Sequence, residues 1–239
     1  MIAGDDAPLW DEPLLLFTWR GCVFRVSDGV QPPKAGSLFF CRHLAVRKGE
    51  RMLEIGGGLG LAAVLAARAG ARVTATDVVP AAIESMRANA ALNGVVIDAR
   101  LGDGWEPVRD ERFDLVCTNP PQMPTPPGRD RDDAEAAADN GGLDGWSLLD
   151  RVIEGAPDHL EPGGRLIFSI FDFLGLKNAH RKLEAVGLAG RVVARETQGF
   201  PRIGFERLEH LRTIDREATL PAHGLPRTVE RFIIEGTRP

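Results

Sequence analysis

From residue 51 onward, short apolar runs of strand length alternate with longer segments of helical character. The apolar run 52–55 ends in glycines, and the alanine-rich segment 61–69 that follows it is closed by Gly70. β-branched residues are frequent in the next run, and Pro80 marks the start of the next helix. The alternation predicts strands at 52–55, 72–77, 95–101, 113–118, 165–171, 191–196 and 229–235, with helices at 61–69, 81–92, 145–159 and 177–186.

The regular alternation of strands and helices indicates the fold class. Strands joined by helices of this length form a parallel sheet with helices on both faces, so the predicted fold is α/β and doubly wound. We expect one domain over 1–239, with a core at 48–239 and a substrate-side extension at 1–47. The connection at 200–227 is predicted to be an insertion, and a substrate lid, a structural hairpin and an interface all fit it. Because parallel sheets bind ligands beyond the carboxyl ends of their strands, the residues after the first four strands are the candidates for a site.

Composition and charge exclude several classes of protein. The longest apolar run, 13–17, is far shorter than the ~20 residues that span a bilayer, so we expect no membrane segment. Three widely spaced cysteines and five scattered histidines offer neither a disulfide framework nor a metal site, as is typical of a cytoplasmic protein without bound metal. The net charge of −5 attracts no nucleic acid, and the composition leaves the oligomeric state open.

A glycine-rich loop follows the first predicted strand, in the sequence Glu54-Ile55-Gly56-Gly57-Gly58-Leu59-Gly60. Glycine lets the backbone turn sharply and lets a ligand approach main-chain N–H groups at a helix N-terminus, so the loop predicts a cofactor site. Two alternatives stay open. One is a tight crossover without a ligand, and the other is a nicotinamide-dependent oxidoreductase, because 58–63 also fits the pattern G-x-G-x-x-A. The candidate cofactor-binding residues are Glu54, Gly56, Gly57, Gly58 and Gly60.

Acidic residues follow the second and third predicted strands. Asp77 lies about 20 residues after the glycine loop, where a carboxylate can accept both hydroxyl groups of a ribose, and Val78 beside it is a further candidate. Asp103-Gly104-Trp105 combines a carboxylate that can bind an exocyclic amine with an aromatic ring that can cover a purine. A turn built by Asp103 and Gly104 is the alternative. The sequence therefore predicts a nucleoside site.

The fourth predicted strand is followed by Asn119-Pro120-Pro121-Gln122. Consecutive prolines stiffen the chain and remove two N–H donors, which leaves the Asn119 side-chain oxygen and the Pro120 carbonyl as acceptors. Two acceptors would hold an amine or amide by its N–H groups and aim the nitrogen at an electrophilic carbon. Asn119 and Pro120 are therefore the candidate catalytic residues, and Gln122 is expected to adjust which acceptor fits. A stiff loop without chemistry is the alternative.

These motifs resemble those of a known family. The E-x-G-x-G-x-G run, Asp77 and Asp103 resemble the class I S-adenosylmethionine-dependent methyltransferases, and Asn119-Pro120-Pro121-Gln122 resembles the N-P-P-(Y/F) signature of methyltransferases acting on base amines and glutamine amides. The segment 139–145 is similar to the G-x-D-G-L segment of HemK-like protein glutamine methyltransferases. Upstream, 30–38 is similar to their P-x-E-D-(T/S) entry, although Ala35 and Gly36 replace the acidic pair.

The resemblance implies a mostly parallel seven-stranded sheet and S-adenosylmethionine as the cofactor. The glycine loop would pass under the methionine moiety, Asp77 would hold the ribose, Asp103 would meet the adenine, and Asn119 would adjoin the cofactor. The implied reaction is methyl transfer to an amine or amide nitrogen of a small molecule or a protein side chain. Gln122 replaces the aromatic residue of the signature, and the Pro-Gln pair is similar to that of plant methionine S-methyltransferases. A small thioether substrate therefore stays open, as does a non-catalytic cofactor-binding subunit.

Three further segments flank the motifs. The acidic segment 128–135, with Asp139 after it, is expected either to attract a cationic substrate or to form a solvated loop. His210 and His223 on the insertion are candidates for a general base, and no feature of the sequence selects one of them. Aromatic residues near the N-terminus either cover the far side of the pocket or pack in the core, namely Trp10, Phe17, Trp19 and Phe24.

Overall fold

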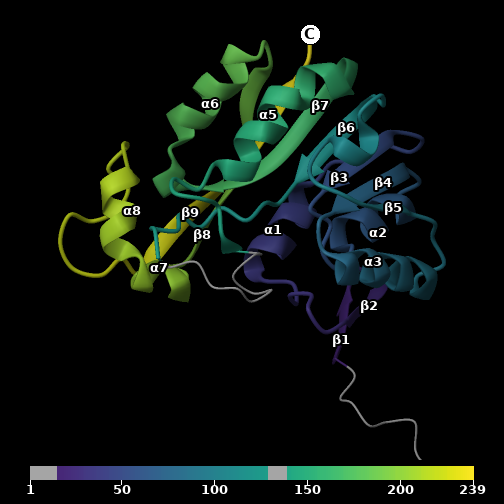
Figure 1. Ribbon diagram of the computed structural model, residues 1–239, viewed down its shortest axis with the longest axis horizontal. Coiled ribbons are helices and arrows are strands. Elements are labelled where there is room, and N and C mark those ends of the chain that lie inside the picture. Colours follow the sequence, from purple (N-terminus) through teal and green to yellow (C-terminus); the bar gives the residue numbers. More distant parts are fainter. Residues whose placement is uncertain (1–14, 129–138) are drawn as a thin grey trace, which may run out of the picture.

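The computed structural model describes residues 15–128 and 139–239, which fold around a seven-stranded sheet (Figure 1). The strands of this sheet are β3 (Arg51–Ile55), β4 (Arg72–Asp77), β5 (Asp98–Leu101), β6 (Phe113–Thr118), β7 (Leu160–Phe171), β8 (Ala189–Gly199) and β9 (Thr228–Thr237). The helices are α1 (Ala35–His43), α2 (Leu61–Arg68), α3 (Pro80–Leu92), α5 (Ser147–His159), α6 (Leu176–Ala185), α7 (Arg202–Glu206) and α8 (Leu208–Ile214). Two 3₁₀ turns, η1 (Glu106–Val108) and η2 (Asp172–Leu174), and a hairpin of β1 (Leu15–Trp19) and β2 (Cys22–Val26) complete the described elements.

The sheet has the strand order β5-β4-β3-β6-β7-β9-β8. The strands from β5 to β7 are parallel, and β9 runs antiparallel between β7 and β8. The predicted doubly wound, mostly parallel α/β fold is confirmed. The chain begins the sheet at β3, builds outward to β5, and then returns to the other side of β3 with β6. The ends of β3 and β6 therefore mark the point where the strand order reverses, which is where such sheets bind ligands.

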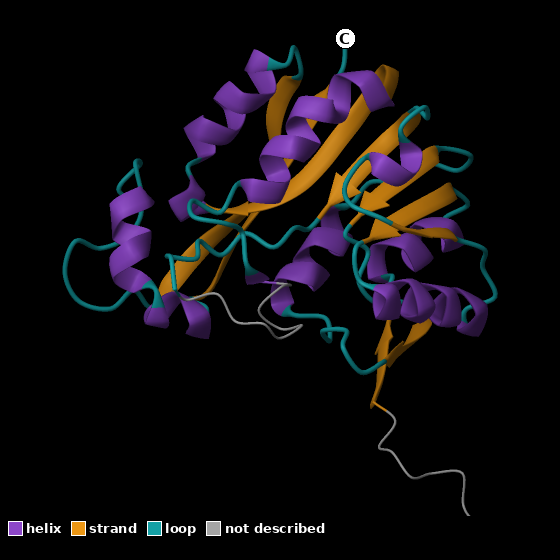
Figure 2. Cartoon of the chain, viewed as in Figure 1, coloured by secondary structure: helices purple, strands orange, loops and turns teal. Residues whose placement is uncertain are grey.

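Two apolar cores cover the two faces of the sheet, as the helices above and below it in Figure 2 show. One core joins the sheet to α5, α6 and α8 through residues such as Leu149, Leu183 and Leu211. The other joins it to α1, α2 and α3 through Phe40, Val64 and similar residues. Because each helix row buries its apolar side against the sheet, the carboxyl ends of the parallel strands are held at one rigid edge.

The N-terminal hairpin is attached to α3 by side-chain amides. Asn89 and Asn93 each accept a hydrogen bond from a β2 backbone N–H and donate one to a β2 carbonyl, with distances of 2.7–3.0 Å. Phe24 is fully buried and packs with Phe17, and neither ring lines the large cavity described below. For these residues the core-packing alternative holds, while Trp10 lies outside the described residues.

The insertion at 200–227 contains α7 and α8 and packs onto the main core. Phe200, Leu208, Leu211 and Leu220 are buried in the core that contains α5 and α6. The segment 200–227 therefore shares this core with α5 and α6, and its α7 end lines the cavity. Within 15–128 and 139–239, no helix has the length and apolar character needed to cross a bilayer.

Candidate functional site

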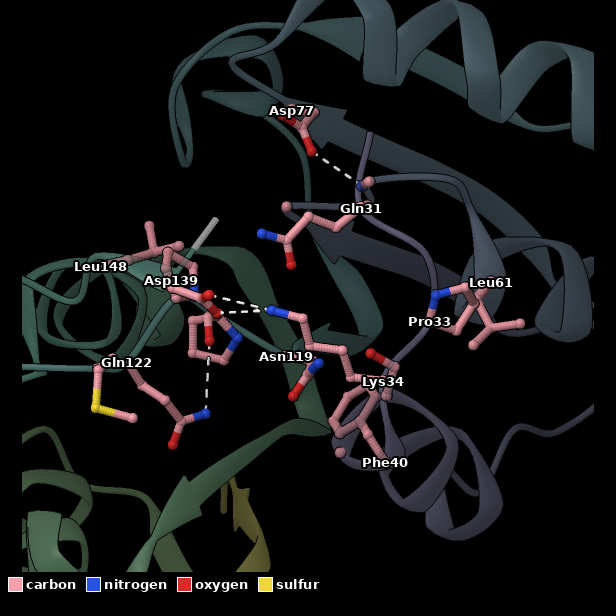
Figure 3. Close-up of a pocket in the computed structure, with 18 of the residues that line it drawn as sticks. Gln31, Pro33, Lys34, Phe40, Leu61, Asp77, Asn119, Gln122, Asp139 and Leu148 are labelled. Atoms are coloured by element: carbon pink, nitrogen blue, oxygen red, sulfur yellow. Dashed lines mark hydrogen bonds and ion pairs between the residues drawn. The ribbon is translucent and has the colours of Figure 1, made fainter. Parts of the chain in front are cut away.

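A cavity of about 1030 Å³ opens at the carboxyl ends of β3, β4, β5 and β6. It is lined by the glycine loop, the segment around Asp77, the Asn119–Gln122 loop, the start of α1 and the α7 end of the insertion. Figure 3 shows Asp77 on one side of this cavity and Asn119 and Gln122 on another. The structure thus brings together eleven of the predicted site residues: Glu54, Gly56, Gly57, Gly58, Asp77, Val78, Asp103, Gly104, Asn119, Pro120 and Gln122.

The glycine loop is tied to the end of β4. The N–H groups of Gly56 and Gly57 donate to the Thr76 carbonyl at 2.8 and 3.1 Å, and Gly58 N–H donates to Asp77 Oδ2 at 2.9 Å. Gly58 has a φ of +55° and open space where a side chain would begin, so the loop backbone faces the cavity directly. Gly60 differs from its predicted role, because it does not line the cavity. A side-chain carbon at Gly60 would instead lie 3.1 Å from Met86 of α3.

Glu54 is a buried acid at the end of β3. Only 5% of its surface is exposed, and its Oε2 accepts a hydrogen bond from Ala63 N–H at 2.8 Å. Burial, with a further contribution from the charge of Asp77, raises the pKa of Glu54 to about 8. The carboxyl has no cationic side chain in contact with it among the described residues, so a positively charged ligand in the cavity would favour its ionised form.

Two acids mark the side of the cavity formed by β4 and β5. Asp77 accepts hydrogen bonds from Gly58 N–H and Val79 N–H at 2.9 Å, one on each oxygen, which leaves a lone pair on each for a diol. Asp103 forms a bidentate ion pair with Arg151 of α5 at 2.6 and 2.9 Å, and this guanidinium lowers the pKa of Asp103. Arg151 is a residue of the cavity wall that the sequence analysis missed.

Trp105 does not have the role expected from the sequence. Its indole N–H donates to the Arg151 carbonyl at 3.0 Å, and its ring stacks on His159 at a centroid distance of 4.2 Å. The indole therefore covers α5, and it is not part of the cavity wall. Leu148 of α5 supplies apolar surface on that wall instead (Figure 3).

The Asn119–Gln122 loop is fixed by β7. Ser169 Oγ donates to Asn119 Oδ1 at 2.6 Å. Gln122 is 4% exposed, accepts a hydrogen bond from Phe171 N–H at 2.9 Å, and donates to the hydroxyl and carbonyl oxygens of Ser169 at 3.2 and 3.3 Å. Gln122 therefore holds the loop against β7 with its amide, and it lines the cavity beside Asn119, where its predicted influence on which acceptor fits stays a prediction.

Ser169 determines which end of the Asn119 amide faces it. The serine oxygen already receives hydrogen bonds from Gln122 Nε2 and, at 3.4 Å, from Arg231 Nη1. Its single proton is therefore available for Asn119 Oδ1, and this oxygen keeps one lone pair for a ligand. Ser169 lies inside an apolar strand run without any motif, so the sequence alone does not reveal its role.

The far side of the loop is held by the insertion and by the segment after residue 138. Arg207 is buried and donates to Thr125 Oγ1 at 2.6 Å and to the Pro124 and Met123 carbonyls at 3.3 and 3.4 Å. Asp139 forms an ion pair with Lys34 at 3.1 Å across the cavity, as Figure 3 shows. The acidic residues of 129–138, which the sequence analysis singled out, lie outside the described residues.

The remaining polar candidates lie elsewhere. His210 Nε2 lies 2.7 Å from the Leu143 carbonyl, and neither His210 nor His223 lines the cavity. Burial raises the pKa of both the Cys41 thiol, which lines the cavity, and the Cys117 thiol in β6, so both groups stay neutral. Among the described residues, no group of three or more acidic, histidine or cysteine side chains is placed to hold a metal ion.

Comparison with known proteins shows the family to which this chain belongs. Residues 30–126 match the family "Methyltransferase small domain". The chain is 32% identical over 177 residues to a putative protein N5-glutamine methyltransferase of Methanocaldococcus jannaschii, covering 74% of this chain and 89% of the relative. It is 36% identical over 203 residues to the release factor glutamine methyltransferase of Cereibacter sphaeroides, covering 79% and 70%. The chain belongs to the HemK-like family of S-adenosylmethionine-dependent methyltransferases.

The solved structures agree with this family in fold. A 16S rRNA methyltransferase of T. thermophilus in complex with AdoMet and guanosine aligns with a TM-score of 0.59 at 17% identity, over 95% of this chain and 50% of that one. Two further relatives found by sequence are a ribosomal protein uL3 glutamine methyltransferase and a release factor glutamine methyltransferase. The aligned regions cover 40% and 56% of the length of these two proteins. The predicted methyltransferase identity is confirmed, and the nicotinamide-dependent alternative is set aside.

The residues of this methyltransferase fit S-adenosylmethionine, which supplies a methyl group on a positively charged sulfur when bound. The glycine loop exposes backbone at the end of β3, Asp77 has free lone pairs for a ribose diol, and Asp103 lies farther along the same wall. Glu54 gives the floor of the cavity an acid whose ionised form is favoured by a cation. These residues would hold the donor on the β3–β5 side of the cavity and leave the Asn119 side for the acceptor.

Proposed function

We propose that this methyltransferase transfers the methyl group to the side-chain amide nitrogen of a glutamine in a protein. The observation that carries the proposal is the pair of acceptors at the Asn119–Gln122 loop, one of which is fixed by Ser169. The Asn119 oxygen and the Pro120 carbonyl can each accept one N–H of a primary amide. The relatives, which are named as glutamine methyltransferases, support the same acceptor.

The proposed site orients the acceptor amide and stabilises the charge that develops on its nitrogen. Two hydrogen bonds fix the amide plane, so the nitrogen faces the donor side of the cavity and needs little further ordering to react. In the reaction an N–C bond forms as the S–C bond of the donor breaks, and one amide proton is lost to water. The Asn119 and Pro120 oxygens stabilise the positive charge that builds on nitrogen before that proton leaves. A thioether offers no N–H to these acceptors, which favours nitrogen over sulfur.

The test uses isotope-labelled S-adenosylmethionine and peptide mass spectrometry. The chain is incubated with purified bacterial release factor and with ribosomal protein uL3, and the digested proteins are searched for one added methyl group. We expect labelled methyl on a glutamine side chain, and we expect the label to be absent with Asn119→Ala. Label on lysine or arginine side chains, or labelling of small amines with no labelled glutamine, would refute the proposal.

A further inference from the structure

A buried arginine, Arg231, lies on the acceptor side of the cavity next to Ser169. Arg231 is on β9, is 9% exposed and lines the cavity. Its Nε has no hydrogen-bond partner within the described part of the chain, and its Nη1 makes a long hydrogen bond to Ser169 Oγ at 3.4 Å. The guanidinium lies over the ring of Phe171, with its central carbon 3.9 Å from the ring centroid.

The charge of Arg231 is only weakly compensated. Burial lowers the pKa of its guanidinium to about 10, and the acids that oppose this shift, Asp139 and Glu196, act on it without an ion pair. Gly36 at the start of α1 packs closely against the guanidinium, since a side-chain carbon there would lie 2.7 Å from the Arg231 Cζ. A buried cation with an unused donor in a cavity gains stability when a ligand supplies an acceptor oxygen.

The sheet order places this cation away from the cofactor residues. β9 is three strands from β3, which carries Glu54 and leads into the glycine loop, so the two strands lie about 14 Å apart at ~4.8 Å per strand. By contrast, Arg231 contacts Ser169, which in turn bonds Asn119. The guanidinium therefore lies within two hydrogen-bond lengths of the Asn119 oxygen, on the side opposite to the donor.

We propose that Arg231 donates a hydrogen bond to the carbonyl oxygen of the acceptor amide, while Asn119 and Pro120 hold its N–H groups. The inference rests on the proposed function and names how the site recognises an amide. A primary carboxamide carries its N–H donors and its C=O acceptor on neighbouring atoms, which matches acceptors at Asn119 and a donor at Arg231. An amine or a thioether has no such oxygen, so Arg231 is a specificity residue that selects amides.

The experiment compares two capped peptides that differ at the recognised oxygen. Acetyl-Gly-Gln-Gly N-methylamide is compared with the matching ornithine peptide, in which a CH₂ group replaces the side-chain carbonyl. Dissociation constants are measured by NMR titration of the full chain saturated with S-adenosylhomocysteine. The variants are Arg231→Met, which keeps the length without the charge, and Arg231→Lys, which restores a cation. Arg195→Met, an exposed arginine of the neighbouring strand β8 outside the cavity wall, is the control.

We expect Arg231→Met to raise the dissociation constant of the glutamine peptide by about tenfold or more, which is the effect of losing a hydrogen bond to a charged group. The ornithine peptide should bind as well as before or better, Arg231→Lys should recover part of the loss, and Arg195→Met should match the wild type. The affinity for S-adenosylhomocysteine should be unchanged in all three. An unchanged preference for glutamine in Arg231→Met, or an equal loss of S-adenosylhomocysteine affinity, would overturn the inference.

A second measurement needs no variant. With nitrogen-labelled arginine, the Nε–H resonance of the buried guanidinium should shift when the glutamine peptide is added to the wild-type protein, and should stay in place with the ornithine peptide. Equal responses to both peptides would overturn the inference. The methyl-transfer assay on whole proteins tests the proposed function separately, so amide binding through Arg231 without glutamine methylation would refute that function alone.

Discussion

The buried acid at the end of β3 makes a quantitative prediction about stability. The carboxyl of Glu54 is enclosed, and burial raises its pKa from the ordinary 4.5 to about 8. In the unfolded chain the same group is in water and ionises near its ordinary value. Between these two values the folded protein therefore binds one more proton than the unfolded chain, and the free energy of unfolding falls as the pH rises.

The size of the effect follows from the interval between the two pKa values. Each pH unit in it is worth about 1.4 kcal/mol, so the whole interval from the ordinary value to the raised one amounts to about 4–5 kcal/mol. The stabilising contribution is fully present below the ordinary pKa and is lost once the pH has passed the raised pKa. Glu54→Gln keeps an oxygen for Ala63 N–H and never ionises, so it removes this loss.

The assay is urea unfolding of the wild type and Glu54→Gln at several pH values from about 5 to about 9. All other titrating groups are common to both proteins and cancel in the difference. We expect the variant to gain stability over the wild type as the pH rises, by about 4–5 kcal/mol above the raised pKa. Asp77→Asn is the matched control, and it should move the wild-type pH dependence to lower pH because Asp77 contributes to the raised pKa. A difference between the two proteins that does not change with pH would refute the reasoning.

Three further predictions concern the cavity wall. Ser169→Ala removes the hydrogen bond that orients the Asn119 oxygen, so kcat for methyl transfer should fall by about tenfold. The affinity for S-adenosylhomocysteine, measured by calorimetry, should stay constant. A matching loss of that affinity would show that Ser169 supports the cofactor instead. Asp77→Ala removes the partner of two loop N–H groups and the expected ribose contact, so S-adenosylhomocysteine should bind at least about tenfold more weakly, and unchanged binding would contradict that role. Arg151→Ala breaks an ion pair whose side chains are 52% and 49% exposed, so it should change the free energy of unfolding by less than about 1 kcal/mol in urea titrations, and a larger loss would show that Asp103 anchors α5.

Much of the sheet was predictable from local pattern. The runs that form β4 and β6 match the predicted 72–77 and 113–118, because each is a compact apolar or β-branched run bounded by residues that break strands. The start of β7 was predicted at 165 and lies at Leu160, since the Pro-Gly-Gly sequence there reads as a turn but continues the strand with a shift in register. The short helices α7 and α8 have too few turns to show a helical period.

The site residues that lie in motifs at strand ends could be predicted from the sequence. The direction in which a side chain points could not. The sequence places Asp77 and Asn119 at strand ends, and a parallel sheet brings those ends together. It cannot show that the Trp105 ring turns toward α5, because a ring next to a site residue can point to either side. Arg231 lies in an alternating strand where a charge is typical of the solvent face, and only the packing of α1 encloses it.

The clamp between Arg207 and the loop at Met123–Thr125 has a consequence for protein engineering. One guanidinium joins the insertion to the acceptor loop through three oxygen atoms. A chimera that exchanges residues 200–227 for the equivalent piece of another enzyme would therefore disturb the acceptor end of the active site, even with every motif left intact. Grafts that retain arginine at position 207 should preserve turnover, whereas grafts without it would lose the donor that these three oxygens share and loosen the loop that carries Asn119.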